Sequence, residues 1–245
     1  MKNYVRRGLV ALVWIGLWQG LAMLVGLPLL LPGPWDTAAA LIRLAGTAAF
    51  WQSVGLTLLR VAAGYMAAVI LGTCLAAGCW KYGWLEAFLS PLRTVIRATP
   101  VTSFIILVLL WIRRGRVPAF ISFLMVLPIV WTGVQEALKN VDRDLEEMTR
   151  AYRFTAVQRL WHLYAPSVRP AFTAACVTGL GFAWKSGIAA EVIALPLQSV
   201  GKNLYDAKVY LETADLFAWT LTVILLSMAL EAVLKALIRR KGETA

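Results

Sequence analysis

The chain has 245 residues, of which 60% are hydrophobic and only 15% are charged. Soluble domains carry about 25% charged residues, so this composition excludes an ordinary soluble fold. The formal net charge of +11 does not indicate nucleic-acid binding, because no soluble face combines Lys and Arg with aromatic or base-reading motifs. In a membrane protein, a basic excess is typical of loops that face the cytoplasm.

Apolar stretches of about 20 residues, each long enough to cross roughly 30 Å of hydrocarbon, recur along the chain. The first runs from Gly8 to Leu31 and has no small-residue cleavage site, so we expect a retained helix and not a secretion signal. A turn and a mildly amphipathic piece follow over residues 32–50. Five further spans are expected over residues 57–80, 91–111, 117–138, 170–193 and 216–237. We therefore predict an all-α membrane protein of about six transmembrane helices in a single domain, residues 1–245.

The segments between these spans differ in character. Residues 81–90 are expected to form a short link, and residues 194–215 a loop. Residues 139–169 are the longest polar stretch and are dense in Asp, Glu and Arg. Placing both termini in the cytoplasm puts most of the 24 Lys and Arg residues on that side, in agreement with the positive-inside rule. The 139–169 stretch is then cytoplasmic, where a soluble partner can dock on it.

Small residues at four-residue spacing in the second span, Gly64, Ala68 and Gly72, favour the close approach of another helix. The three cysteines lie in apolar stretches without metal-ligand spacing, and we expect buried apolar residues and no disulfide framework: Cys74, Cys79 and Cys176.

The polar stretch carries the most specific motif in the chain. It reads Glu147-Met148-Thr149-Arg150-Ala151-Tyr152-Arg153, then nine residues, then Leu163-Tyr164-Ala165-Pro166. This motif resembles the EAA loop of ABC importer permeases, in which two short helices sit in a groove of the ATPase subunit. The resemblance implies that the ATPase-coupling residues are Glu147, Met148, Arg150, Ala151, Arg153, Leu163 and Pro166.

Three residues in and beside this motif carry structural expectations of their own. Arg153 stands where the family has Gly, and a non-glycine residue does not easily take a positive φ, so we expect the turn after the first short helix to be built differently. Pro166 is expected to stop the second short helix before the fifth span begins. The lone histidine, His162, makes neither a metal site nor a triad, and we expect a packing or surface role.

Further stretches resemble the nitrate, sulfonate, taurine and bicarbonate branch of these permeases. They are residues 31–34, 57–65, 91–93, 97–100, 181–184, 189–191 and 213–215. The resemblance implies the MetI-like fold of type I importers, a second permease copy, two cytoplasmic ATPases and an extracytoplasmic solute-binding protein. The chain has no Gly-rich phosphate loop, metal-ligand pair or nucleophile elbow, so we expect no enzyme activity and no cofactor. ATP and Mg would be bound by the partner ATPase.

Polar groups at membrane depth are the candidates for the solute path. Lys185 lies between Trp184 and Ser186 and is a candidate to hold an anionic solute. The alternative is a structural role, in which Lys185 snorkels to the outer interface or pairs with Glu191. A second candidate is the break at Pro100, where a broken helix exposes polar groups to a cavity. Its hydroxyls either face that cavity or bond to the preceding turn: Thr99, Thr102 and Ser103.

The predicted outer loop carries a basic cluster, Arg113, Arg114 and Arg116. These residues either dock the binding protein and draw anions to the entrance or form a short exposed loop without a role. The sequence thus indicates an importer permease for a small anion such as a sulfonate, taurine or nitrate. The alternatives are an importer permease for a thiamine-precursor pyrimidine or other heterocycle, with Trp184 as a stacking surface, and an ATP-independent channel or membrane scaffold.

Overall fold

A computed structural model describes the backbone of residues 2–242, and the side chains of these residues except 2–5, 7, 8, 11 and 239–242. Every regular element in this part of the chain is helical, which confirms the all-α prediction. The chain divides into two compact units. One comprises the chain up to Thr57 together with Leu195–Leu226, and the other comprises Leu58–Ala194 and the residues from Ser227 onward. The single-domain assignment remains a prediction.

The first unit is held together by contacts between its two sequence segments. It contains α1 (Lys2–Val25), α2 (Pro34–Ala45), the start of α3 (Ala48–Lys81), α10 (Val200–Val209) and most of α11 (Thr213–Gly242). The Trp18 ring stacks on Phe217 at a centroid distance of 6.0 Å. Arg43 forms an ion pair with Asp215, and the Thr213 hydroxyl donates to the Leu29 carbonyl.

The loop expected over residues 194–215 is wrong in part, because it contains α10. This helix begins at a polar cap, where the Ser199 hydroxyl accepts a hydrogen bond from the Lys202 amide. The first helical amide, that of Val200, donates to the Thr57 hydroxyl at 3.1 Å. Lys202 and Asp206 add an ion pair at i, i+4 spacing. Local caps and pairs therefore order a short helix that hydrophobic patterning does not reveal.

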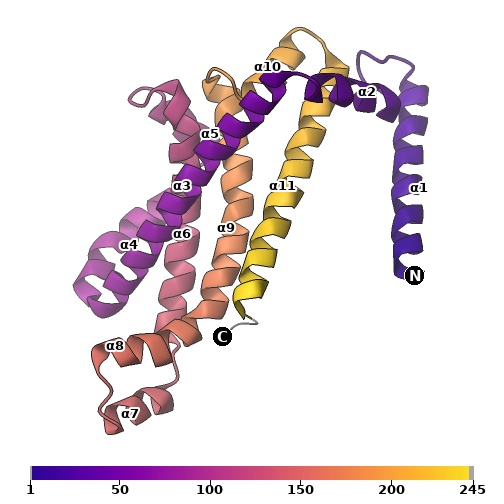
Figure 1. Cartoon of the computed structure of the whole chain (residues 1–245). Coiled ribbons are helices and arrows are strands. Elements are labelled where there is room, and N and C mark those ends of the chain that lie inside the picture. Colours follow the sequence, from indigo (N-terminus) through magenta and orange to yellow (C-terminus); the bar gives the residue numbers. More distant parts are fainter. Residues whose placement is uncertain (1, 243–245) are drawn as a thin grey trace. The chain divides into compact units, whose positions relative to one another are not determined.

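The second unit is built around α6 (Val117–Lys139) and α9 (Ala165–Ala194), which lie side by side (Figure 1). The Ser122 hydroxyl donates to the Ala183 carbonyl between these two helices. On the α3 side, a Cβ built at Gly64 would lie 2.0 Å from the Ala119 carbonyl oxygen, and one at Gly72 would lie 3.2 Å from Leu127 O. The small-residue stripe is therefore a packing surface for α6, as predicted.

The third predicted span is a bent pair of helices. α4 (Gly83–Ala98) and α5 (Val101–Val108) meet at an angle of 103° around Thr99 and Pro100. The expected short link over residues 81–90 is wrong, because α4 already begins at Gly83. The remaining elements of this unit are short helices on either side of α6: η1 (Arg114–Arg116), α7 (Arg143–Ala151), α8 (Ala156–Arg159) and the π-helical turn η2 (Leu160–Tyr164).

Three described helices, α3, α6 with η1, and α11, are long and apolar enough to cross a membrane, or four spans when the α4–α5 pair is counted as one. In the described part of α1, residues 12–25 form a shorter apolar helix. The 30-residue α9 is long enough, but Lys185, Glu191 and several Gly, Ser and Thr residues lower its mean hydropathy. With α1 and α9 included, the helices are consistent with about six spans.

Candidate functional site

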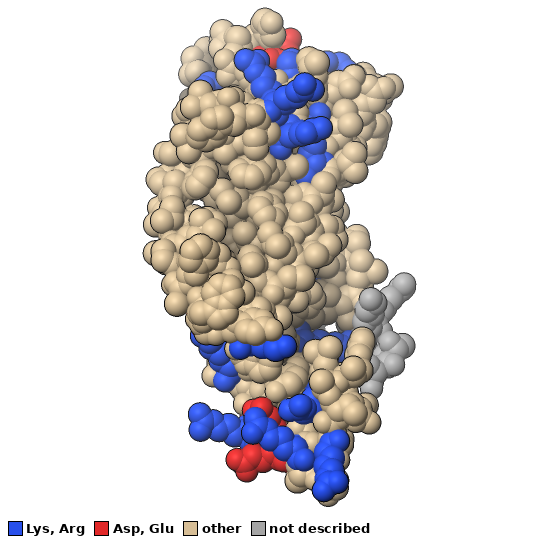
Figure 2. Space-filling view, turned by 90° about the vertical axis from the view of Figure 1, so that its left-hand side faces the viewer, with Lys and Arg blue, Asp and Glu red and all other residues tan. Residues whose placement is uncertain are grey.

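Local charges stabilise α7, the first short helix of the polar stretch. Asp142 caps its amino end by accepting a hydrogen bond from the Asp144 amide at 2.9 Å. Glu146 and Arg150 form an i, i+4 ion pair of 2.9 Å, and the acidic first turn and basic last turn both suit the helix dipole. Figure 2 shows charged side chains gathered at the lower end of the view, where α7 and α8 lie, below a broad uncharged surface.

The turn after α7 has a left-handed residue at the position where the family pattern has Gly. Arg153 adopts φ +52°. The Phe154 amide donates to Thr149 O at 2.9 Å, and the Arg153 amide donates to Arg150 O at 3.0 Å. These two bonds form a Schellman motif, which satisfies the last carbonyl groups of the helix. The expectation that Arg153 would avoid a positive φ is wrong, because these hydrogen bonds hold it there.

The second short helix continues into the fifth span without a break. Thr155 and Gln158 form a capping box at the start of α8. The chain then passes through the π-helical turn, in which the Ala165 amide donates to Leu160 O, and enters α9 with Pro166 as its second residue. The prediction that Pro166 ends this helix is wrong. A π turn is wider than an α turn, and it accommodates a proline that lacks an amide and crowds the preceding turn.

Tyr164 links the polar stretch to the spans. Its ring contacts Trp80 of α3 edge-on at a centroid distance of 4.9 Å, and its hydroxyl donates to Glu146 Oε1 at 3.4 Å. Burial raises the pKa of the Tyr164 phenol, and the nearby Glu146 carboxylate raises it further, so the hydroxyl stays protonated. His162 packs edge-on against Phe154, in agreement with a packing role. Tyr164 therefore connects α7 with α3, and it lies in the turn that leads into α9.

The predicted coupling residues differ in exposure. Leu163 is buried and fixes the segment to the unit, whereas the others are exposed: Glu147, Met148, Arg150, Ala151, Arg153 and Pro166. Large apolar side chains are exposed beside them, including Trp161 at 68% and Tyr152 at 73%. Exposed apolar side chains outside the spans and rimmed by charge are typical of a surface that binds another protein. We refer to residues 143–164 as the coupling segment.

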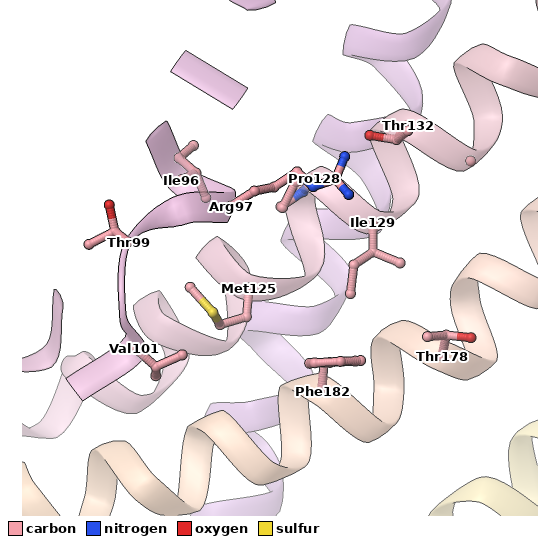
Figure 3. A pocket seen from close by; sticks show the side chains of 11 residues that line it. Ile96, Arg97, Thr99, Val101, Met125, Pro128, Ile129, Thr132, Thr178 and Phe182 are labelled. Carbon is pink, nitrogen blue, oxygen red and sulfur yellow. The ribbon is translucent and has the colours of Figure 1, made fainter. Parts of the chain in front are cut away.

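A cavity of about 500 Å³ lies beside the bend between α4 and α5 (Figure 3). It is lined from the bend, α6 and α9 by Ile96, Arg97, Thr99, Val101, Met125, Pro128, Ile129, Thr132, Gly133, Thr178 and Phe182. Of the predicted hydroxyls, Thr99 lines the cavity, although its Oγ1 donates to Val95 O at 2.8 Å. Thr102 and Ser103 are exposed and are not among the lining residues. The break at Pro100 therefore lies beside a cavity, as predicted, but the Thr99 hydroxyl bonds to the preceding turn.

Lys185 lies apart from the other polar residues of α9. It is exposed, whereas Trp184, Ser186 and Glu191 are buried. Glu191, with no exposed surface, pairs with Arg60 of α3 at 3.2 Å, so the suggested Lys185–Glu191 pair is wrong. Arg60 lies within the second predicted span and was not predicted as a site residue, and its side chain is only 16% exposed. Its partner is 131 residues away in the sequence, and no local pattern reveals it.

The basic cluster Arg113, Arg114 and Arg116 is exposed at the end of the unit where α5 leads into η1. Arg113 and Arg116 line a second cavity, of about 410 Å³, together with Trp111, Ile112 and Phe120. The cluster is therefore exposed, as both interpretations of it require.

The family model for the binding-protein-dependent transport system inner membrane component matches residues 64–243. This chain belongs to that family of ABC importer permeases. It is 25% identical over 219 residues to the taurine transport system permease protein TauC of Escherichia coli, covering 87% of this chain and 79% of the relative. It is 28% identical over 229 residues to the riboflavin transport system permease protein RibX of Chloroflexus aurantiacus, covering 89% and 84%.

A third relative of this permease is the putative aliphatic sulfonates transport permease protein SsuC of Escherichia coli, 26% identical over 185 residues, 75% of this chain and 70% of the relative. The matched family region contains the coupling segment, the bend and the cavity. The permease is therefore a multi-pass membrane protein and a transport component.

Proposed function

We propose that this permease is the membrane subunit of an ATP-driven importer, that two cytoplasmic ATPases bind its coupling segments, and that it imports a small anion. The coupling segment is the observation that carries the proposal. It offers exposed Trp161, Met148 and Tyr152 for burial in a partner, and Tyr164 joins it to Trp80 of α3. ATP and Mg belong to the ATPases in this proposal, and the permease itself has no catalytic role.

Several further features of the assembly belong to the same proposal. Two copies of the permease form the pathway, the termini lie in the cytoplasm, and an extracytoplasmic binding protein delivers the solute. Charge distribution supports the orientation, since the coupling segment then lies inside with the basic residues near it. The exposed Arg113, Arg114 and Arg116 are proposed to dock the binding protein on the outer face.

Two observations support an anion as the solute. Relatives are named for taurine and aliphatic sulfonates, and among the described residues that line the cavity Arg97 is the only charged one. The similarity to a riboflavin permease favours a second candidate, an uncharged heterocycle. Phe182 supplies an aromatic wall for such a solute in the cavity.

Co-purification with the cognate ATPase tests the proposal. Trp161→Glu places a charge in the exposed apolar surface of the coupling segment, and we expect it to abolish recovery of the ATPase with the permease. Trp35→Glu is the matched control, because Trp35 of α2 is also highly exposed, at 81% against 68% for Trp161. Equal recovery with both variants, or solute flux through the permease alone in liposomes, would contradict the proposal.

A further inference from the structure

The cavity beside the α4–α5 bend combines one cation, several hydroxyls and apolar walls. We propose that it binds an organic monoanion with an apolar body, such as an alkyl sulfonate or carboxylate, with Arg97 holding the charged group. This inference rests on the proposed function and assigns the solute class to this cavity. Three features of the described residues lead to it: the state of Arg97, an unpaired hydroxyl, and the composition of the walls.

Arg97 is the charged group of the cavity. Its side chain extends from α4 toward α6, and its nitrogen atoms lie near Pro128 in the view of Figure 3. Within residues 2–242 as described, no carboxylate lies within ion-pair distance of Arg97. Its neighbour in α4, Arg93, differs in this respect, because it donates to Gln135 at 2.7 Å and lies over the Trp131 ring. Arg97 therefore has its donors available for a planar or tetrahedral oxyanion.

Thr132 supplies the second, independent observation. Its Oγ1 atom is buried and has no hydrogen-bond partner among the described residues, although the side chain lines the cavity. Buried hydroxyls in folded proteins are nearly always hydrogen-bonded, so the Thr132 hydroxyl requires a partner that the described residues do not supply, either a water molecule or a polar group of a ligand. Thr178 of α9 adds a second hydroxyl to the lining. A hydroxyl donates readily to an oxyanion, so the lining offers two threonine hydroxyls and one guanidinium as donors to a group with several oxygen atoms.

The walls determine the rest of the ligand. Most of the lining is apolar and includes Met125 and Ile129 of α6 and Phe182 of α9 (Figure 3). A cavity of about 500 Å³ falls in the range of small-molecule sites, and its apolar surface favours a ligand that covers it. Among the described residues that line the cavity none is Asp or Glu, so they supply no counter-charge for the ammonium group of a zwitterion. This composition distinguishes an alkyl sulfonate from bicarbonate and from taurine.

The test measures thermal stabilisation of the full-length permease in lipid nanodiscs by four probes: 1-hexanesulfonate, 1-hexanol, taurine and bicarbonate. A ligand that binds only the folded protein raises the unfolding temperature with concentration. We expect 1-hexanesulfonate to give the largest shift. Arg97→Gln should weaken its apparent affinity at least about tenfold, as loss of a charge-assisted bond does, and Thr132→Val should weaken it less. Arg97→Lys retains the charge, and this variant should bind 1-hexanesulfonate more tightly than Arg97→Gln does.

Lys208→Gln is the matched control, since Lys208 is an exposed cation of α10 outside the cavity. We expect this variant to bind 1-hexanesulfonate with unchanged affinity. Equal shifts with 1-hexanol would show an apolar site without charge recognition, and equal shifts with bicarbonate or taurine would remove the requirement for an apolar body; each result overturns the proposal. If no probe shifts the unfolding temperature while Trp161→Glu still releases the ATPase, the solute class is wrong and the importer function stands.

Discussion

The α6–α9 core and the coupling segment are both helical, but different forces hold them. Buried side chains and backbone contacts hold α6 against α9 and α3, with Ile121, Val126 and Ala183 fully buried. The coupling segment relies on caps and one ion pair, and most of its side chains are exposed. The core therefore has its structure fixed within the chain, whereas the coupling segment has a surface that only a partner can cover. Tyr164 connects the two regions, because its ring contacts Trp80 of α3 and its hydroxyl donates to Glu146 of α7.

Breaking the buried ion pair should have the largest effect on the core. Arg60→Met leaves the Glu191 carboxylate without its guanidinium partner at a site with no solvent exposure, and we expect a loss of about 3–5 kcal/mol. Thermal unfolding in detergent measures the loss. Arg43→Met is the control, because Arg43 is 64% exposed in its pair with Asp215, and it should cost at most about 1 kcal/mol. If both variants unfold at the same temperature, the Arg60 pair does not stabilise the core.

Filling the α3–α6 contact should have the next largest effect. Gly64→Ala places a methyl group against the Ala119 carbonyl, which forces the helices apart and should cost about 1–3 kcal/mol. The yield of monodisperse protein and its unfolding temperature provide the measurement. Gly55→Ala is the matched control in the same helix, since nothing lies within 4 Å of a Cβ built there. A neutral Gly64→Ala variant would show that the helices are not held this closely.

In the coupling segment, Arg153→Gly should stabilise the turn after α7. A left-handed conformation costs a non-glycine residue roughly 1–2 kcal/mol, and glycine removes this cost. Hydrogen exchange at the Phe154 amide, which donates to Thr149 O, should slow. Arg153→Ala keeps the Cβ atom and serves as the control for loss of the side chain. Faster exchange in the glycine variant would mean that the Arg153 side chain, and not the backbone, governs the turn.

Removing the Tyr164 hydroxyl, which connects the two regions, should have the smallest effect. Tyr164→Phe deletes the hydroxyl that donates to Glu146 but keeps the ring against Trp80, and at 3.4 Å the lost bond is worth about 0.5 kcal/mol. We expect faster hydrogen exchange in α7 with no change in the unfolding temperature of the core. A lower core unfolding temperature would mean that the two regions are not separable in this way.

The sequence predicted the core better than the sites. The fourth span was expected over residues 117–138 and is Val117–Lys139, because a continuous apolar run determines a buried helix. Short helix α10 was missed, since its stability comes from Ser199 and from Thr57, which lies 143 residues away. Arg97 was not predicted as a site residue. Its place in the cavity depends on the 103° bend, which the position of Pro100 suggests but does not measure.

The π-helical turn between α8 and α9 affects the direction in which α8 faces about the axis of α9. A π turn holds one more residue than an α turn, and each residue of a helix advances it by about 100°. Deleting one residue within Leu160–Tyr164 would therefore rotate α8 by roughly this angle about the axis of α9 and carry Val157 away from its present direction. The extra residue of the π turn therefore determines the direction in which the coupling segment faces, independently of the side chains of that segment.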